Sequence, residues 1–407
     1  MDAPRPKLFT RTYIFLFATN FVFFLGFYML APTLPLYGAH LGGNSTQVGM
    51  VSTAFSIASV AVRFSATFLV ERFGRKGLMS LGILLAMLLS LGYPLVHSIY
   101  SVMLLRIVQG LGFGLVTTYC AAMVADSLPD ERRGEGIGYF GLGTSVAFAF
   151  SPAVGLAFVN HMGFPIMFVA AAIAFAGALA VFQFTRDPVA ARAKKAAAGP
   201  AAPAVKPPWW NRFFDTSITW PFILLLLFGL GRGAEQNFIP LLAKTEDLSA
   251  LSVFYIINTT MVFLLRFFTS RTYDKKGPLF SAILGGIMVA ASMMTMSLVH
   301  GNLVLILAAI FSGMGIGLLV PTYQVWVITS VPPEKRTMGS ALYYNTYDIG
   351  IAVGSVLYGA IAGRLGYHGM FRVCFYVTIL YLILCLIVRA KGKHRPPAAE
   401  PPAEPSE

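Results

Sequence analysis

The chain repeats one local pattern in its two halves. An Arg-Phe pair begins at Arg63 and again at Arg266, which lies 203 positions later in a chain of 407 residues. In each copy an acid follows eight positions after the arginine, Glu71 in the first and Asp274 in the second, and a basic turn with a glycine comes next. Because chance rarely preserves one register in this way, the pattern indicates a duplicated unit. We therefore expect two similar halves and a function located between them.

Apolar runs long enough to cross a membrane fill both halves. A transmembrane helix needs roughly 20 apolar residues, and 57% of the chain is hydrophobic whereas only 12% is charged. The runs are continuous rather than alternating, which favours helices over barrel strands. The sequence predicts an all-α integral membrane protein with twelve transmembrane helices in two pseudo-symmetric bundles of six. The expected helices are 13–37, 46–70, 77–96, 99–125, 134–160, 164–184, 218–243, 250–270, 279–299, 303–328, 338–362 and 369–388.

Composition divides the chain into four segments. Residues 1–185 hold the first six helices and residues 217–389 the second six. Between them, residues 186–216 are rich in Ala, Pro, Gly and Lys, which is typical of a flexible linker. Residues 390–407 are rich in Pro, Ala and Glu, and we expect a disordered tail there.

The basic residues indicate how the chain is oriented in the membrane. The net charge is +13, and Lys and Arg gather in alternate loops, at both termini and in the linker. Cytoplasmic loops carry such an excess, so both termini and the linker are expected in the cytoplasm. We predict a multi-pass protein of the plasma membrane, which in a bacterium is the inner membrane. Its expected partner is the lipid bilayer, and we expect it to bind no nucleic acid. The three cysteines lie in apolar runs and indicate neither disulfides nor a metal site.

Two motifs in the first half carry a resemblance to a known family. The turn after the second helix reads Thr67-Phe-Leu-Val-Glu71-Arg72-Phe73-Gly74-Arg75-Lys76. It is close to the pattern Gly-x-x-x-Asp-Arg-x-Gly-Arg-Arg/Lys, with Thr67 in place of the glycine and Glu71 in place of the aspartate. Arg106-Ile-Val-Gln109-Gly110 in the fourth helix matches Arg-x-x-Gln-Gly. With these motifs and six plus six helices, the whole chain resembles the major facilitator superfamily. The resemblance implies a transporter whose turn after the second helix forms a cytoplasmic gate, with Asp126 as the partner of an arginine in that turn.

The fifth helix carries part of a pattern that exporters of this superfamily share. They typically have Gly-x-x-x-Gly-Pro-x-x-Gly-Gly, of which Pro152 and Gly155 remain here, with Ser151 in place of a glycine. This partial motif and the exporter-like loop 129–136 favour export over uptake.

The expected gate combines the duplicated motif with its neighbours. Arg63 and Arg266 lie about 10 Å from the cytoplasmic helix ends. We expect them to extend toward those ends or to bond carbonyl groups there, and a gating role is the second interpretation. The gate residues are Arg63, Glu71, Arg72, Gly74, Arg75, Asp126, Arg266 and Asp274.

Ionisable side chains inside the helices are the candidates for proton coupling. A charge at mid-bilayer costs about 3 kcal/mol or more. Asp348 lies about 15 Å into the eleventh helix, and Tyr344 and Asn345 share much of its face. We expect Asp348 to carry a proton; the alternative is a carboxylate that ties its helix to a neighbour. Glu235 is the second candidate, although its spacing also fits a plain ion pair with Arg232.

A polar central cavity is expected between the bundles. Arg106 has no evident acid in the first half, so it either receives an anionic group or meets Glu235 or Asp348 across the interface, and we include it in the proton-coupling set. The residues expected to line the cavity are Asn20, Tyr28, Gln109, Tyr119, Arg232, Gln236, Asn258, Tyr323, Gln324, Trp326, Tyr344 and Asn345.

These features predict a secondary transporter that works as a monomer by alternating access. The leading hypothesis is a proton-coupled exporter of small amphiphilic drugs or metabolites, with no cofactor or metal and with the proton gradient as its energy source. The first alternative is proton-coupled uptake of a small metabolite, including an anionic one, and the second is a membrane receptor or lipid-handling protein. No Gly-x-x-x-x-Gly-Lys-Ser/Thr motif occurs, which disfavours ATP hydrolysis. We find no nucleophile–base arrangement typical of an enzyme.

Overall fold

The computed structural model describes residues 8–129, 132–185, 216–330 and 336–390. The predicted linker and tail lie almost entirely outside this part of the chain. Within it we find α-helices and one short 3₁₀ turn, η1 (Tyr93–Leu95), and no strand. The helices of the N-terminal half are α1 (Arg11–His40), α2 (Ser45–Gly92), α3 (Ile99–Ser127), α4 (Arg133–Met162) and α5 (Phe164–Gln183). Those of the C-terminal half are α7 (Thr216–Thr245), α8 (Leu251–Lys276), α9 (Pro278–Ser297), α10 (Asn302–Thr329) and α11 (Arg336–Ala390).

Two of these helices cross the membrane twice. The backbone of α2 turns at Gly74 and that of α11 turns at Gly366, each with φ of 68°, a left-handed conformation that glycine adopts without steric cost. The turns are so tight that the predicted helices 46–70 and 77–96 merge into α2, and 338–362 and 369–388 merge into α11. The twelve predicted crossings are therefore present, although two expected loops are single bends.

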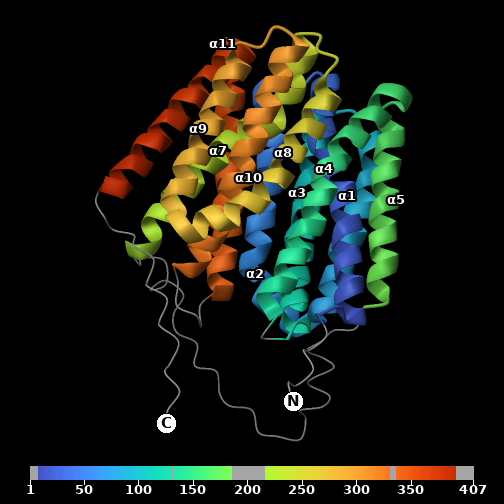
Figure 1. Cartoon of the computed structure of the whole chain (residues 1–407). Coiled ribbons are helices and arrows are strands. Elements are labelled where there is room, and N and C mark those ends of the chain that lie inside the picture. Colours follow the sequence, from blue (N-terminus) through green and yellow to red (C-terminus); the bar gives the residue numbers. More distant parts are fainter. Residues whose placement is uncertain (1–7, 130–131, 186–215, 331–335, 391–407) are drawn as a thin grey trace, which may run out of the picture.

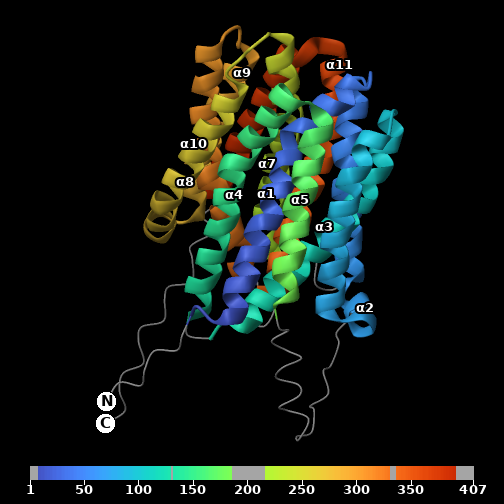
Figure 2. The same ribbon diagram turned by 90° about the vertical axis from the view of Figure 1, so that its right-hand side faces the viewer.

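The two halves stand side by side. Figure 1 shows the N-terminal half, in blue to green, beside the C-terminal half, in yellow to red, and Figure 2 shows the same helices after a quarter turn. We call the end of the molecule that carries Ser45 and Gly366 the distal side. The opposite end, which carries Gly74 and Gly277, is the terminal side.

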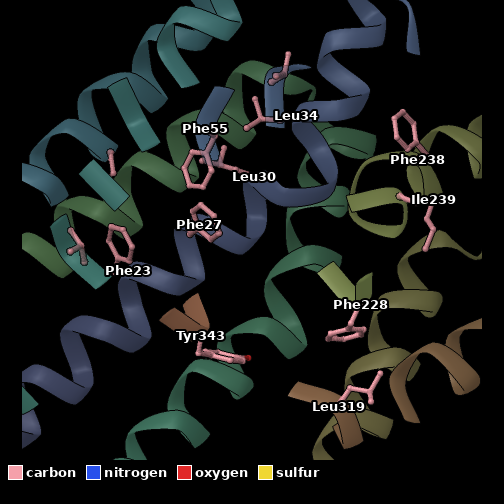
Figure 3. Close-up of a cluster of buried hydrophobic side chains, with 14 of the residues drawn as sticks. Phe23, Phe27, Leu30, Leu34, Phe55, Phe228, Phe238, Ile239, Leu319 and Tyr343 are labelled. Atoms are coloured by element: carbon pink, nitrogen blue, oxygen red, sulfur yellow. The ribbon is translucent and has the colours of Figure 1, made fainter. Parts of the chain in front are cut away.

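Aromatic side chains fill the interior of the N-terminal bundle. The rings of Phe27 and Phe113 stack with centroids 4.4 Å apart, and Phe55 lies 5.4 Å from Phe27. Figure 3 shows Phe27 and Phe55 pointing toward each other from α1 and α2. Since lipid is as apolar as these rings, van der Waals packing rather than water exclusion holds the helices together. The resulting rigid bundle fixes the side of α2 that faces the other half.

Candidate functional site

An ion pair joins the two bundles near the middle of the membrane. Arg63 Nη1 in α2 lies 2.5 Å from Asp348 Oδ2 in α11 and 3.4 Å from Asn345 Oδ1. The side chain of Arg63 is 8% exposed and that of Asp348 is 19% exposed. Asp348 follows Arg336, the first residue of α11, by twelve positions, which places it about 18 Å along that helix. A desolvated pair at this depth connects the two halves directly.

The expectation for Arg63 is therefore wrong. Its guanidinium does not extend to a helix end but faces Asp348 of the opposite bundle, and the ring of Tyr344 lies 6.0 Å from its central carbon. The physical reason is depth: Arg63 lies far enough into α2 that its guanidinium reaches the carboxylate of Asp348 across the interface. Tyr344 and Asn345, which were expected on the face of Asp348, both contact Arg63 of this pair, and Gln324 donates a hydrogen bond of 3.5 Å to the hydroxyl of Tyr344.

A second buried ion pair lies one helix away. In α7, Arg232 Nη1 binds Glu235 Oε2, as the three-residue spacing predicts, and the two side chains are 12% and 4% exposed. Among the described residues, no hydrogen-bond partner is found for the buried Glu235 Oε1. Tyr347 interacts electrostatically with Arg232 and with Asp348. The two acids therefore belong to one polar region of the C-terminal bundle.

Polar contacts close the bundles together on the distal side of this region. Ser52 in α2 donates to Asn237 Oδ1, and Asn237 Nδ2 donates to Ser355 Oγ at 2.9 Å. Thr53 Oγ1 donates to the carbonyl of Ala352 at 2.6 Å. Sequence reasoning missed these residues, because short hydroxyl and amide side chains are common in membrane helices and nothing in their spacing identifies a partner. The contacts describe a conformation in which the distal side is shut.

One contact of the predicted gate is present, between Asp126 and an arginine of the turn after the second helix. Arg75 Nη1 lies 2.5 Å from Asp126 Oδ2, and both residues belong to the N-terminal bundle. Arg72 instead lies over the ring of Phe73, with 5.6 Å between the guanidinium carbon and the ring centroid. The side chains of Glu71, Arg266 and Asp274 lie outside the described part of the structure, so their gate role stays a prediction.

Asp126→Asn should have only a small effect on stability. The side chains of Arg75 and Asp126 are 29% and 36% exposed, and water screens such pairs to about 0–1 kcal/mol. A double-mutant cycle with Arg75→Gln, measured by reversible unfolding in mixed micelles, should give a coupling free energy below about 1 kcal/mol. A coupling of about 3 kcal/mol would show that the pair is desolvated and would contradict this assignment.

Arg106 lies inside the N-terminal bundle. Its Nη1 donates to Gln109 Oε1 at 2.9 Å, and its guanidinium carbon lies 4.0 Å from the ring centroid of Phe55. Gln109 Oε1 also accepts a hydrogen bond of 2.9 Å from Tyr93. The suggested meeting of Arg106 with Glu235 or Asp348 is not observed, because each acid has its own arginine. A role for Arg106 in proton coupling stays a prediction.

Several predicted cavity residues are bonded within one bundle in this conformation. Asn20 donates to Thr144 at 2.7 Å, and Asn258 donates to Ser312 at 2.9 Å. The hydroxyls of Tyr323 and Tyr381 are 2.7 Å apart. Of the remaining ones, Trp326 stacks on Tyr323, Tyr28 lies edge-on to Phe148, Tyr119 is buried and Gln236 is half-buried. Their contact with a substrate stays a prediction.

The predicted fifth helix, residues 134–160, is α4 in the structure, and its motif packs α4 against α1. A Cβ atom at Gly155 would lie 2.6 Å from the carbonyl oxygen of Met29, so only glycine permits this approach. Ser151 Oγ donates to the carbonyl of Ala147 at 2.6 Å, and Pro152 lies in the interior of α4. The motif therefore has a packing role inside one bundle, and its link with export stays a prediction.

A groove of about 730 Å³ runs between α2 and α11. Its walls include Phe64, Ile57 and Val353, whose side chains are 61%, 60% and 51% exposed. None of the predicted cavity residues is among those that line it. Two lining residues, Phe64 and Ile349, directly follow Arg63 and Asp348 in the chain. An apolar surface thus adjoins the central ion pair.

Known proteins resemble this chain in sequence and in fold. The family model for the Major Facilitator Superfamily matches residues 16–355 and 304–406. The staphylopine export protein of Staphylococcus aureus (strain Mu50) is 22% identical over 382 residues, which cover 91% of this chain and 94% of that protein. The quinolone resistance protein NorA of Staphylococcus aureus (strain MSSA476) is 23% identical over 222 residues, which cover 54% of this chain and 56% of NorA. The crystal structure of the nucleoside transporter NupG has a TM-score of 0.73 at 14% identity and covers 93% of this chain and 99% of that chain, a likeness in fold.

Proposed function

Because the chain belongs to the Major Facilitator Superfamily and is thus a multi-pass membrane transporter rather than an enzyme, we propose that it exports small amphiphilic compounds in exchange for protons. Two relatives support the direction: one is named for the export of staphylopine and another for quinolone resistance. The basic residues support an orientation with the terminal side in the cytoplasm and the distal side outside. In that orientation the described conformation is shut to the outside.

The observation that carries the proposal is the ion pair of Arg63 with Asp348 between the bundles. A proton on Asp348 removes one charge of a desolvated pair, and leaving the other charge unpaired costs about 3–5 kcal/mol. Since 1.4 kcal/mol corresponds to a factor of ten, this cost shifts the balance between closed and open conformations by on the order of 100-fold or more. Protonation therefore weakens the closed distal side and favours opening to the outside.

Exchange also requires that cargo and proton compete for one group. A cationic or polar head that binds Asp348 would compete with Arg63 for the carboxylate and break the same ion pair without a proton. Either a proton or a cargo molecule would therefore release the bundles, and each would exclude the other. The apolar groove between α2 and α11 offers a surface for the hydrophobic body of such a compound. Glu235, whose Oε1 has no hydrogen-bond partner within the described part of the chain, is the second group that can accept a proton. These features support an amphiphilic cargo rather than a fully polar one.

Proteoliposomes test both the coupling and the cargo class. The protein is reconstituted with a trapped pH indicator, and cationic amphiphiles are compared with anionic metabolites of similar size. We expect cationic amphiphiles to move protons in the opposite direction, and Glu235→Gln to reduce the number of protons per cargo molecule. Proton movement in the same direction as an anionic metabolite would instead establish uptake, and transport without any pH change would exclude proton coupling.

A further inference from the structure

Three side chains with metal-binding atoms converge on the distal side of the C-terminal bundle. Glu246 follows the end of α7, His300 precedes the start of α10, and His368 lies two residues past the bend of α11 at Gly366. Glu246 Oε1 is 2.8 Å from His368 Nε2, and Glu246 Oε2 is 3.2 Å from His300 Nδ1. One donor atom from each residue lies within 4.8 Å of the others. Three segments that are distant in sequence thus present one carboxylate and two imidazoles to the same point.

We propose that Glu246, His300 and His368 bind a divalent transition-metal ion, with Zn²⁺ as the ion that fits best. Two imidazole nitrogens and one carboxylate oxygen are a ligand set that zinc accepts, and water supplies the fourth position. Mg²⁺ and Ca²⁺ prefer oxygen ligands in larger numbers. The donor set therefore selects the class of metal.

The distances fit such an ion after a small adjustment. Bonds of about 2.0–2.1 Å in a tetrahedral site place ligand atoms about 3.4 Å apart. The carboxylate–imidazole separations of 2.8 and 3.2 Å therefore have to widen by about 0.6 and 0.2 Å, and the three ligand atoms, which now lie within 4.8 Å of one another, have to reach the same spacing. The side chain of His300 is 75% exposed, so this movement meets little resistance and an ion can enter from the aqueous phase.

The position of the site indicates what a bound ion would do. It would tie together the distal ends of α7, α10 and α11, all of which belong to the C-terminal bundle. Tyr367, the neighbour of His368, lies 3.3 Å from Ser45 Oγ of α2, hydroxyl oxygen to hydroxyl oxygen. The ion would thus stabilise the C-terminal bundle beside its contact with α2.

Calorimetric titration of the full-length protein with Zn²⁺ tests the site. The protein is purified with an affinity tag that contains no histidine. We expect one Zn²⁺ per chain, and an affinity at least about tenfold weaker in His300→Ala and in His368→Ala. His97→Ala and His161→Ala, which change exposed histidines elsewhere, should bind as the wild type does. Thermal unfolding should occur at a higher temperature with Zn²⁺ and return to its starting value with a chelator.

Three results would overturn the proposal. One is the absence of Zn²⁺ binding by the wild type up to millimolar concentration, which would leave the three residues as a hydrogen-bonded cluster. The second is undiminished Zn²⁺ binding by the His300→Ala variant. Because His300 is exposed, this variant is expected to fold normally. Equal binding of Mg²⁺ and Zn²⁺ would also count against it, because attraction to the carboxylate alone would then explain the result.

Discussion

Asp348→Asn should reduce proton-coupled transport by on the order of 100-fold while the protein still folds. The substitution keeps the shape of the side chain but removes its charge, which leaves the buried guanidinium of Arg63 without its acid. An unpaired buried charge costs about 3–5 kcal/mol, and this cost falls on the conformation in which the two bundles meet. The variant should therefore favour the open distal side at every pH. The measurements are initial transport rates in proteoliposomes and thermal unfolding of the purified variant.

A matched control separates the charge from the local contacts. Asn345→Ala removes another neighbour of Arg63, whose Oδ1 lies 3.4 Å from Nη1, but takes away no charge. It should retain transport within a few-fold of the wild type. In a chain that carries Asp348→Arg, Arg63→Asp should restore part of the activity, since the pair is re-formed in the opposite sense. Full activity of Asp348→Asn alone would show that the pair has no part in coupling.

Gly49→Leu should abolish transport by preventing closure of the distal side. A Cβ atom at this position in α2 would lie 2.1 Å from the carbonyl oxygen of Ser355 in α11, closer than such atoms approach in proteins. Because the obstacle is the backbone of the opposite bundle, each bundle can fold normally but the two cannot meet. We expect less than about 1% of wild-type transport, since a loss of about 3 kcal/mol already corresponds to more than 100-fold.

The control is Gly363→Leu in α11. Among the described residues, nothing lies within 4 Å of the position of its added Cβ atom, so transport and stability should change little. If Gly49→Leu transports normally, α2 and α11 do not approach this closely during the cycle. If it fails to fold while Gly363→Leu folds, the contact belongs to the stability of the protein rather than to its movement.

The helices were predictable because the membrane imposes their length. Each apolar run has to span the bilayer with its own backbone hydrogen bonds satisfied, and all twelve crossings lie where the runs predict. Tight bends at Gly74 and Gly366 were not expected as such, since a glycine between two apolar runs is compatible with either a loop or a bend. Local pairs were also predictable, since Glu235 follows Arg232 by three positions, a spacing that places both on one face of a helix.

The contacts between distant segments could not be predicted in the same way. Depth in the membrane follows from counting residues, so Asp348 could be placed near the middle, but the direction in which Arg63 points depends on how α2 is rotated against α11. Arg106 shows the same limit, since its face is set by packing around Phe55. The cluster of Glu246 and two histidines has no spacing that indicates it, because three separate connections bring it together.

The most direct test of the central claim is a distance measured across the distal side as the pH changes. Leu95 and Leu303 are 78% and 74% exposed at the distal ends of the two halves, and the native cysteines, Cys120, Cys374 and Cys385, are buried. Spin labels on Leu95→Cys and Leu303→Cys report the separation of the bundles by pulsed electron paramagnetic resonance. We predict a longer distance at low pH in the otherwise unchanged protein, and the longer distance at every pH when Asp348→Asn is added. A distance that does not change with pH, or that changes equally in the wild type and in the Asp348→Asn variant, would contradict the account.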